Sequence, residues 1–170
     1  VGGYRAWKSY DEGQRGDASD AFAAATMLAQ SDDSEAALAA YGELSAEGEG
    51  GYGLLASFEQ ARLLAAEGKT EDAIAIWDRI AASSDVGKGF KGIATLLSVL
   101  HQLGTADAAS LRARLDPLAA TGPFRAGATE LLAAVELREG NSSEARLLYG
   151  QIADDVTAPQ GLRARAAQML

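Results

Sequence analysis

The apolar residues of this chain recur at helical spacing, in stretches that polar residues and glycines separate. Residues three and four apart share one helix face, so each stretch predicts a helix with one buried side. Gly13 and Gly16 should each weaken the middle of the first helix by roughly 1 kcal/mol relative to alanine, and Pro117 should kink or end the sixth. The predicted helices lie near residues 4–30, 33–47, 52–67, 70–83, 87–103, 106–120, 123–139, 142–155 and 158–170.

The same pattern of residues returns at a period of 36. The turn positions are Asp32, Gly68, Gly104 and Gly140, and alanine follows each by five residues, at 37, 73, 109 and 145. Seven residues before the turns stand Ala25, Ala61, Leu97 and Ala133, and nine after them stand Tyr41, Trp77, Ala113 and Tyr149. Small residues let two helices approach, and glycine adopts the left-handed conformation that ends a helix. Each copy is therefore predicted to be a helical hairpin that buries its apolar face by stacking on its neighbours.

Polar residues after the turns are suited to begin the second helix of each hairpin. Thr70, Thr105 and Asn141 are predicted N-caps. Asn141 has Glu144 three residues later, which is typical of a capping box.

Composition supports helices and excludes several kinds of site. Among 170 residues, 37 are alanine, 21 are leucine and only three are proline, which favours close-packed helices over a β-sandwich or barrel. The chain has no cysteine and one histidine, so a thiolate nucleophile, a disulfide scaffold and a multi-histidine metal centre are excluded. We expect no catalytic residue, no metal and no cofactor.

Negative charge is concentrated in one part of the chain. The formal net charge is −9, and no Lys or Arg lies between Arg15 and Arg62, where nine acids stand. Such a field repels phosphate backbones, so nucleic acid is not an expected partner. Two interpretations of residues 16–61 stay open: a solvated face that keeps the protein in solution, or a docking patch for a basic partner.

The repeated positions resemble the tetratricopeptide repeat, a hairpin of about 34 residues. The best copy runs from Leu54 to Gly87, with the family's pattern at Ala61, Leu64, Gly68, Ala73, Trp77 and Ile80. The resemblance implies an all-α, right-handed α-solenoid of about four such hairpins over residues 18–158. An N-terminal helix would cover 1–17 and a C-terminal capping helix 159–170. It also implies a scaffold that binds proteins.

Three stretches are similar to a narrower family, the ancillary subunit of the bacterial Sec translocon (YfgM-like), whose domain is related to a cell-division coordinator. They are Tyr4–Trp7, Gly51–Glu59, and Leu115–Leu118 leading to Glu144–Arg146. That resemblance implies a single-pass protein of the bacterial inner membrane with this domain in the periplasm. The Sec translocon and periplasmic chaperones would be its partners, and an anchor of about 20 apolar residues would precede Val1.

Aromatic and basic residues alternate near the N-terminus, at Tyr4, Arg5, Trp7 and Lys8. This mixture is typical of a membrane–water interface, where amphipathic rings and cations gather. Packing of the same aromatics on the first hairpin explains the pattern equally well, so both interpretations stay open.

In tetratricopeptide repeats the first helix of each hairpin lines a concave groove. Carried onto this chain, the family's groove positions give a candidate protein-binding set: Phe22, Phe58, Arg62, Lys91, Ser98, His101, Gln102, Glu130 and Arg138. Phe22 and Phe58 would anchor a helix or extended segment, and the cations would orient it. For His101, ordinary packing is the alternative.

We therefore predict a non-catalytic binding scaffold. Gly48–Gly53 matches the string of a dinucleotide-binding loop, but a predicted helix precedes it where that loop needs a strand. The alternatives are a self-associating module, which leaves monomer and dimer both open, and a soluble adaptor with another partner. An enzyme with hidden carboxylates would need a closed pocket that holds acids of raised pKa.

Overall fold

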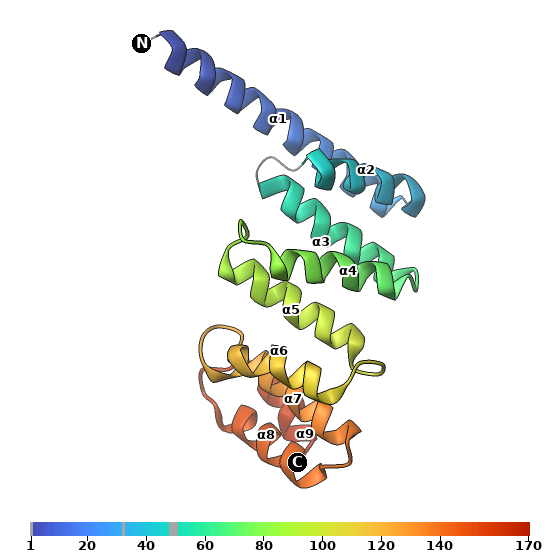
Figure 1. The fold of residues 1–170 in the computed structure, drawn as a ribbon, viewed down its shortest axis with the longest axis vertical. Coiled ribbons are helices and arrows are strands. Elements are labelled where there is room, and N and C mark those ends of the chain that lie inside the picture. The colour runs from blue at the N-terminus through green and yellow to red at the C-terminus, as the bar shows by residue number, and fades with distance from the viewer. Residues whose placement is uncertain (1, 32, 48–50) are drawn as a thin grey trace. The chain divides into compact units, whose positions relative to one another are not determined.

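The computed structural model gives the backbone for residues 2–31, 33–47 and 51–170, and side chains for 16–31, 33–46 and 51–170. Over these residues the protein is all-α and built of helical hairpins, as predicted (Figure 1). The helices of this part of the chain are α1 (Gly2–Gln30), α2 (Ser34–Glu47), α3 (Gly51–Ala66), α4 (Thr70–Ala82), α5 (Lys88–Gln102), α6 (Ala108–Ala120), α7 (Arg125–Arg138), α8 (Ser142–Asp154) and α9 (Gln160–Gln168).

The chain divides into two compact units, Val1–Trp77 and Asp78–Leu170. In the first unit α1, α2 and α3 lie side by side around a small core. Ala25, Ala37 and Ala56 are completely buried between the helices, while Tyr41 and Leu44 supply the bulk. The small residues predicted to let helices approach do so here. Gly16 does not interrupt α1, which runs through it.

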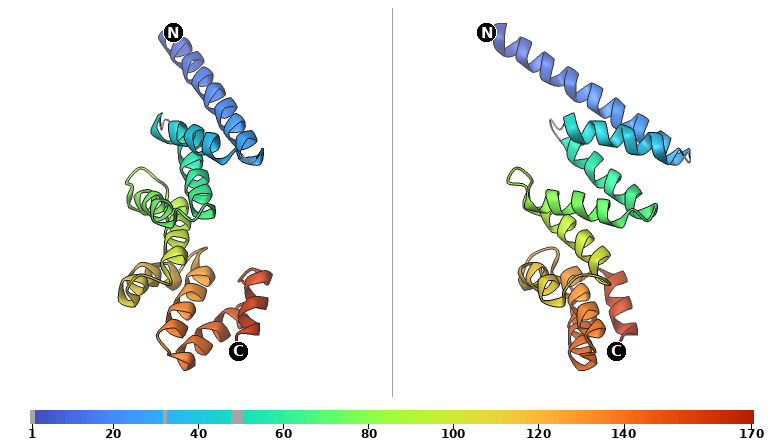
Figure 2. Two further views of the ribbon diagram at one scale, coloured as in Figure 1. Left: turned by 90° about the vertical axis from the view of Figure 1, so that its right-hand side faces the viewer. Right: turned by 45° about the vertical axis from the view of Figure 1, so that its right-hand side comes forward.

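The second unit has two apolar clusters. Val99 of α5, Leu111 and Leu115 of α6, and Val135 of α7 form the first cluster. The second cluster contains Ala133, Ala145, Tyr149, Ile152 and Ala166. These residues come from α7, α8 and α9, the helices that lie together at the C-terminal end of the ribbon in Figure 2. The last helix therefore covers the final hairpin through Ala166, which is the capping role predicted for it.

Of the two effects predicted for Pro117, a kink or an end of the sixth helix, the end does not occur. α6 continues past it to Ala120. A proline inside a helix removes one backbone hydrogen bond and crowds the preceding turn. Here Pro117 is exposed, while the buried Leu111 and Leu115 fix α6 to the core on its other side. The apolar packing of the helix therefore outweighs the loss of one bond.

The third hairpin departs from the repeat that the sequence suggests. Ala108 is buried and Ala109 is exposed, so α6 is shifted by one residue. Five residues separate α5 from α6, whereas three separate α3 from α4 and α7 from α8. Asp107, not Thr105, is the N-cap of α6, and its carboxylate accepts from the Ser110 amide at 2.9 Å. The longer connection accounts for the change of register.

The glycine turns are of two kinds. Gly68 and Gly140 have φ of 79° and 82°, which confirms the left-handed conformation predicted for them. Gly104 does not adopt a positive φ, and Gly122, which the period of 36 does not mark, has a φ of 95°. Asp32 lies outside the described residues.

Candidate binding surface

An aromatic cluster joins the three helices of the first unit. The centroid of the Phe22 ring lies 5.6 Å from that of Tyr41 and 5.8 Å from that of Tyr52. The Tyr41 hydroxyl is 3.0 Å from Thr26 Oγ1, and the Tyr52 hydroxyl donates to Ser19 Oγ at 3.1 Å. Phe22, a predicted anchor, is therefore half-buried among these rings, and only part of its surface is left for a partner.

α3 presents the two other predicted contacts of the first unit on one face. Phe58 is half-buried and Arg62 is exposed. Arg62 Nε donates to Glu59 Oε2 at 2.8 Å, one turn earlier on the same helix. Leu55, also exposed, shares this face because it precedes Arg62 by seven residues. An apolar residue and a cation are thus available together on α3.

Two of the predicted groove residues of α5, Ser98 and Gln102, belong to a polar cluster. Ser98 is completely buried, and its hydroxyl donates to Asp78 Oδ1 at 2.5 Å. The same oxygen accepts from Gln102 Nε2 at 2.7 Å and from Arg114 Nη2 at 3.0 Å. A buried hydroxyl has to find such partners. Ser98 therefore connects α5 with α4 and α6, with Gln102 donating to it from the same helix, and Ser98 is closed to any outside partner in this structure.

The exposed side of α5 lies one residue away from the predicted groove positions. Lys91 and His101 are half-buried, whereas Phe90, Ile93 and Leu100 are 42%, 40% and 49% exposed. Leu97, which is half-buried, completes a stripe of four apolar residues. The repeat pattern placed Leu97 at a small-residue position, although the small residue is its neighbour Ser98. These four apolar residues are three, four and three positions apart, and this spacing alone predicts that they share one face of the helix.

A close approach between α5 and the start of α7 fixes which side of α5 is buried. The Phe124 ring lies against Gly92 so closely that a Cβ at Gly92 would stand within 2.5 Å of two of its ring carbons. One turn later, Leu96 Cδ1 lies 3.5 Å from where a Cβ of Gly127 would be. Only glycine permits the approach at position 92, whereas a Cβ at position 127 would make an ordinary van der Waals contact. α5 thus turns Gly92 and Leu96 towards α7, which leaves the apolar stripe on another side.

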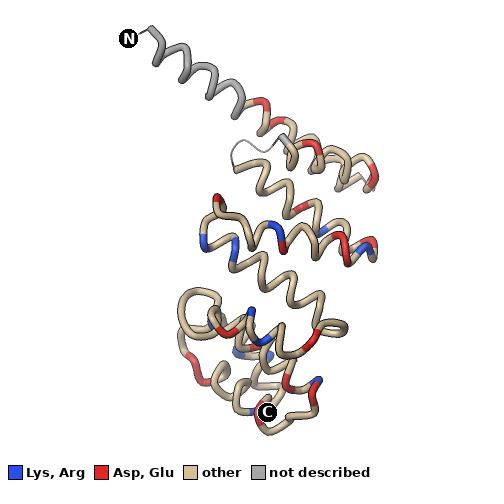
Figure 3. Tube along the Cα trace, viewed as in Figure 1, with Lys and Arg blue, Asp and Glu red and all other residues tan. Residues whose placement is uncertain are grey.

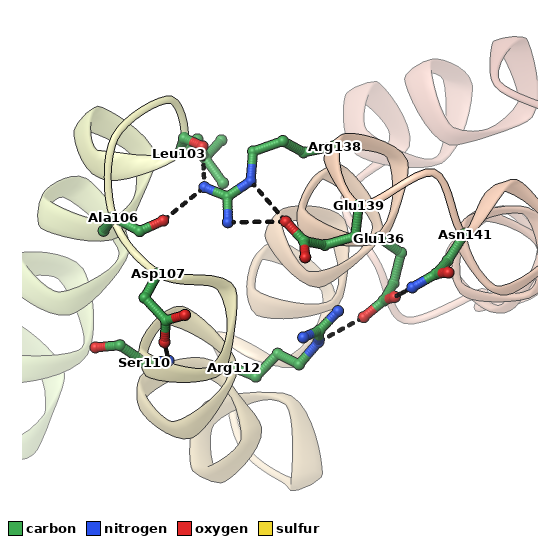
Figure 4. Close-up of polar contacts among 9 residues, drawn as sticks. All are labelled: Leu103, Ala106, Asp107, Ser110, Arg112, Glu136, Arg138, Glu139 and Asn141. Atoms are coloured by element: carbon green, nitrogen blue, oxygen red, sulfur yellow. Dashed lines mark hydrogen bonds and ion pairs between the residues drawn. The ribbon is translucent and has the colours of Figure 1, made fainter.

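Two predicted groove residues of α7 make contacts inside the second unit. Arg165 of α9 forms a two-bond pair with Glu130, at 3.1 and 2.9 Å. Arg138 Nη1 donates to the carbonyl oxygens of Leu103 and Ala106, at 2.5 and 2.8 Å, and so holds the connection between α5 and α6 (Figure 4).

A second network in Figure 4 joins α6, α7 and the start of α8. Arg112 Nε donates to Glu136 Oε1 at 2.7 Å, and Asn141 Nδ2 donates to Glu136 Oε2 at 2.8 Å. These hydrogen bonds, that from Arg112 foremost, hold the pKa of the Glu136 carboxyl below its usual value. Asn141 is the N-cap residue of α8, but its side chain makes no capping bond. The predicted capping box with Glu144 is therefore wrong, because Glu136 takes the Asn141 amide.

The remaining predictions concern the acidic residues, metal binding and contact with a membrane. Asp17, Asp20 and Glu43 are exposed, as a solvated acidic face requires. Figure 3 marks the acidic positions along the Cα trace of the described residues. In the described part of the chain, no group of His, Asp and Glu could hold a metal ion, and no helix is long and apolar enough to cross a bilayer. The side chains of the proposed membrane-interface residues, Tyr4, Arg5, Trp7 and Lys8, lie outside the described residues.

Residues 1–169 match a family model, the tetratricopeptide repeat-like domain. The chain belongs to the tetratricopeptide repeat-like family. No curated protein and no solved structure gives a significant match to it. Domains of this family are in general protein-interaction scaffolds and typically non-catalytic, because stacked hairpins create extended surfaces rather than closed pockets. Protein partners are therefore expected of this tetratricopeptide-like domain, and its groove residues stay a prediction.

Proposed function

We propose that this tetratricopeptide-like domain is the periplasmic part of a single-pass inner-membrane protein that recruits partners around the Sec translocon, periplasmic chaperones among them. The observation that carries the proposal is the family match over residues 1–169, joined to the stretches that resemble the ancillary translocon subunit. The helix α1 is continuous from Gly2 to Gln30. It would connect an upstream anchor to the first hairpin without a break.

The domain would act by holding partners, without chemistry of its own. In the first unit, α3 offers Leu55 and Arg62 on one exposed face, which suits an apolar segment with an acidic group beside it. The carboxyl groups of Glu136 and Asp155 are engaged by hydrogen bonds that lower their pKa, Thr157 contributing most at Asp155. A general acid near neutral pH needs a shift in the opposite direction. A binding role is therefore favoured over catalysis.

The proposal can be tested in membranes with the full-length protein. A photo-crosslinking residue replaces Arg62 on α3, and a matched control replaces Val156, which is 81% exposed in the connection before α9. We expect adducts with a translocon subunit or a periplasmic chaperone from position 62 and not from position 156. In parallel, protease should digest the domain in spheroplasts but not in intact cells. A domain that resists protease in spheroplasts, or equal adducts from both positions, would contradict the proposal.

A further inference from the structure

α9 is held on its unit by fewer buried residues than its neighbours are. Ala166 is the single buried residue among residues 160–168, all of which the structure describes, whereas α5, α6, α7 and α8 each bury three or more. Leu162 packs partly against the same apolar cluster. Burial of apolar surface is the main force that holds helices together, and a helix of nine residues is marginal by itself in water. α9 should therefore leave the unit more easily than any of these helices.

The polar contacts of α9 are partly open to water. Arg165 donates two hydrogen bonds to the Glu130 carboxylate, at 3.1 and 2.9 Å, but its side chain is 60% exposed. Arg163 Nε donates to the Ala153 carbonyl oxygen at 3.3 Å. Exposed ion pairs contribute little to stability, because water competes for the same groups. These contacts favour a local opening in which α9 leaves while α7 and α8 stay folded.

The face beneath α9 is apolar, with an acid at its side. Ala133 of α7 and Tyr149 and Ile152 of α8 form one cluster with α9 and are buried while α9 is in place. Burial and, after it, the charge of Glu130 raise the pKa of the Tyr149 hydroxyl, so this carboxylate lies near the cluster. We call Glu130, Ala133, Tyr149 and Ile152 the α9 site.

α9 itself shows which occupant this site takes. Leu162 and Ala166, four positions apart, pack on the apolar cluster, and Arg165 lies beside them at the carboxylate. α9 has two arginines and no Asp or Glu over residues 160–168, although the chain as a whole has a formal charge of −9. A helix with the same apolar spacing and a cation beside it is therefore favoured, whereas Glu130 would repel an acidic helix.

We propose that α9 is a displaceable cover of the α9 site, and that a basic amphipathic helix of a partner protein takes its place. The partner helix has a leucine, an arginine three positions later and a small residue after it, as in Leu162–Ala166. Glu130, a predicted groove contact, is then available only when α9 has left, so release of α9 controls binding. The inference rests on the proposed function only in that the domain binds proteins, and it requires neither the translocon nor the periplasm.

The test uses the full chain of 170 residues and a fluorescein-labelled peptide with the sequence of residues 158–170. Ala166→Asp places a charge at a completely buried position and should release α9 from the site. In fluorescence anisotropy, A166D should bind the peptide at least ~tenfold more tightly than the parent, whose own α9 covers the site. The matched control A164D puts the same charge at an exposed position of α9 and should bind like the parent.

An exchange of charge decides whether Glu130 recognises the peptide. In the A166D background, E130R should weaken binding of this peptide by ~tenfold or more and should favour a peptide that carries R165E. Hydrogen exchange should show α9 unprotected in A166D while α7 and α8 stay protected. If A166D also unfolds α8, R165E in the full chain replaces it, because that variant breaks the exposed pair and leaves the buried cluster unchanged. Peptide binding should then rise by a smaller factor.

Three results would overturn the proposal. The first is a peptide affinity that neither A166D nor R165E changes while α7 and α8 stay protected. The second is an unchanged choice between the two peptides after E130R. The third is a dimer of the parent in light scattering that A166D dissociates, because α9 would then be exchanged between two copies. Since these measurements use only purified protein and peptides, loss of translocon adducts in membranes would refute the proposed function while leaving the α9 site in place.

Discussion

Among the described residues of the unit that ends at Trp77, aromatic rings and hydroxyl groups connect the helices. In the unit that begins at Asp78, arginine–carboxylate pairs connect them. Phe22, Tyr41 and Tyr52 meet in the first unit, and Ser45 and Ser57 share a hydrogen bond of 2.7 Å between α2 and α3. In the second, the pairs that link different elements are Arg112–Glu136, Arg114–Asp78, Arg125–Asp155 and Arg165–Glu130.

The charge content of the two units follows the same division. The first has 14 acidic and 5 basic residues and the second has 10 of each, so the whole formal charge of −9 belongs to the first. Acids of the first unit such as Asp17 and Glu43 are exposed, so that water solvates them. One hairpin scaffold is thus held together by two kinds of contact, of which only the ionic kind depends strongly on pH and salt.

Tyr41→Ala should have the largest effect and should break the first unit alone. Tyr41 is 1% exposed, packs against Phe22 and shares a hydrogen bond with Thr26. Removing a buried aromatic side chain of this size destabilises a core by about 3–5 kcal/mol. Hydrogen exchange, read separately for each helix, should show faster exchange in α1, α2 and α3.

Thr129 offers a control for that measurement in the other unit. It is buried in α7 and its hydroxyl bonds the Arg125 carbonyl of the same helix, so Thr129→Ala should lower protection locally in α7 and leave α1–α3 unchanged. If Tyr41→Ala lowered protection equally in α7 and α8, the two units would unfold together. That result would contradict the prediction that the substitution affects the first unit alone.

Glu136→Leu tests the ionic contacts of the second unit. It leaves Arg112, whose side chain is two-thirds buried, without its carboxylate, and the stability of the unit should fall by about 1–3 kcal/mol. R112L/E136L should recover most of that loss, because two apolar groups can replace a buried pair. Urea denaturation of both variants measures the difference. A double variant no more stable than Glu136→Leu would mean that the pair fixes the helices in a way that packing cannot replace.

The same pair predicts how stability depends on pH. Because Arg112 and Asn141 lower the pKa of Glu136 in the folded state, the carboxylate contributes its full stabilisation above the ordinary carboxyl value of 4.5. That contribution is lost as pH falls from there through the folded pKa. The difference in unfolding free energy between the parent and Glu136→Gln should therefore be largest near pH 7 and shrink towards pH 3. A difference that stays constant over this range would rule out the linkage.

Much of the fold follows from the sequence because it depends on local spacing. Apolar residues at three and four positions fix each helix, and buried alanines such as Ala37 and Ala145 fix where helices meet. The exposed side of α5 could not be predicted in the same way. It depends on Phe124 packing against Gly92 and on a longer connection before α6, and both are properties of tertiary packing that a fixed period of 36 cannot express.

Substitutions of the turn glycines should have the smallest effects on stability. They compare the same position of the repeat in the two units. Gly68 in the first unit and Gly140 in the second both have positive φ, so alanine at either position should destabilise the protein by about 1 kcal/mol. Gly104 stands at the same place in the repeat but lacks a positive φ, and a Cβ there would meet no atom within 4 Å. Gly104→Ala should therefore leave stability unchanged or raise it by about 0.5 kcal/mol, since alanine restricts the unfolded chain. Thermal denaturation of the three variants provides the comparison. Equal losses at all three positions would show that the sequence period, not the local backbone, decides what these turns require.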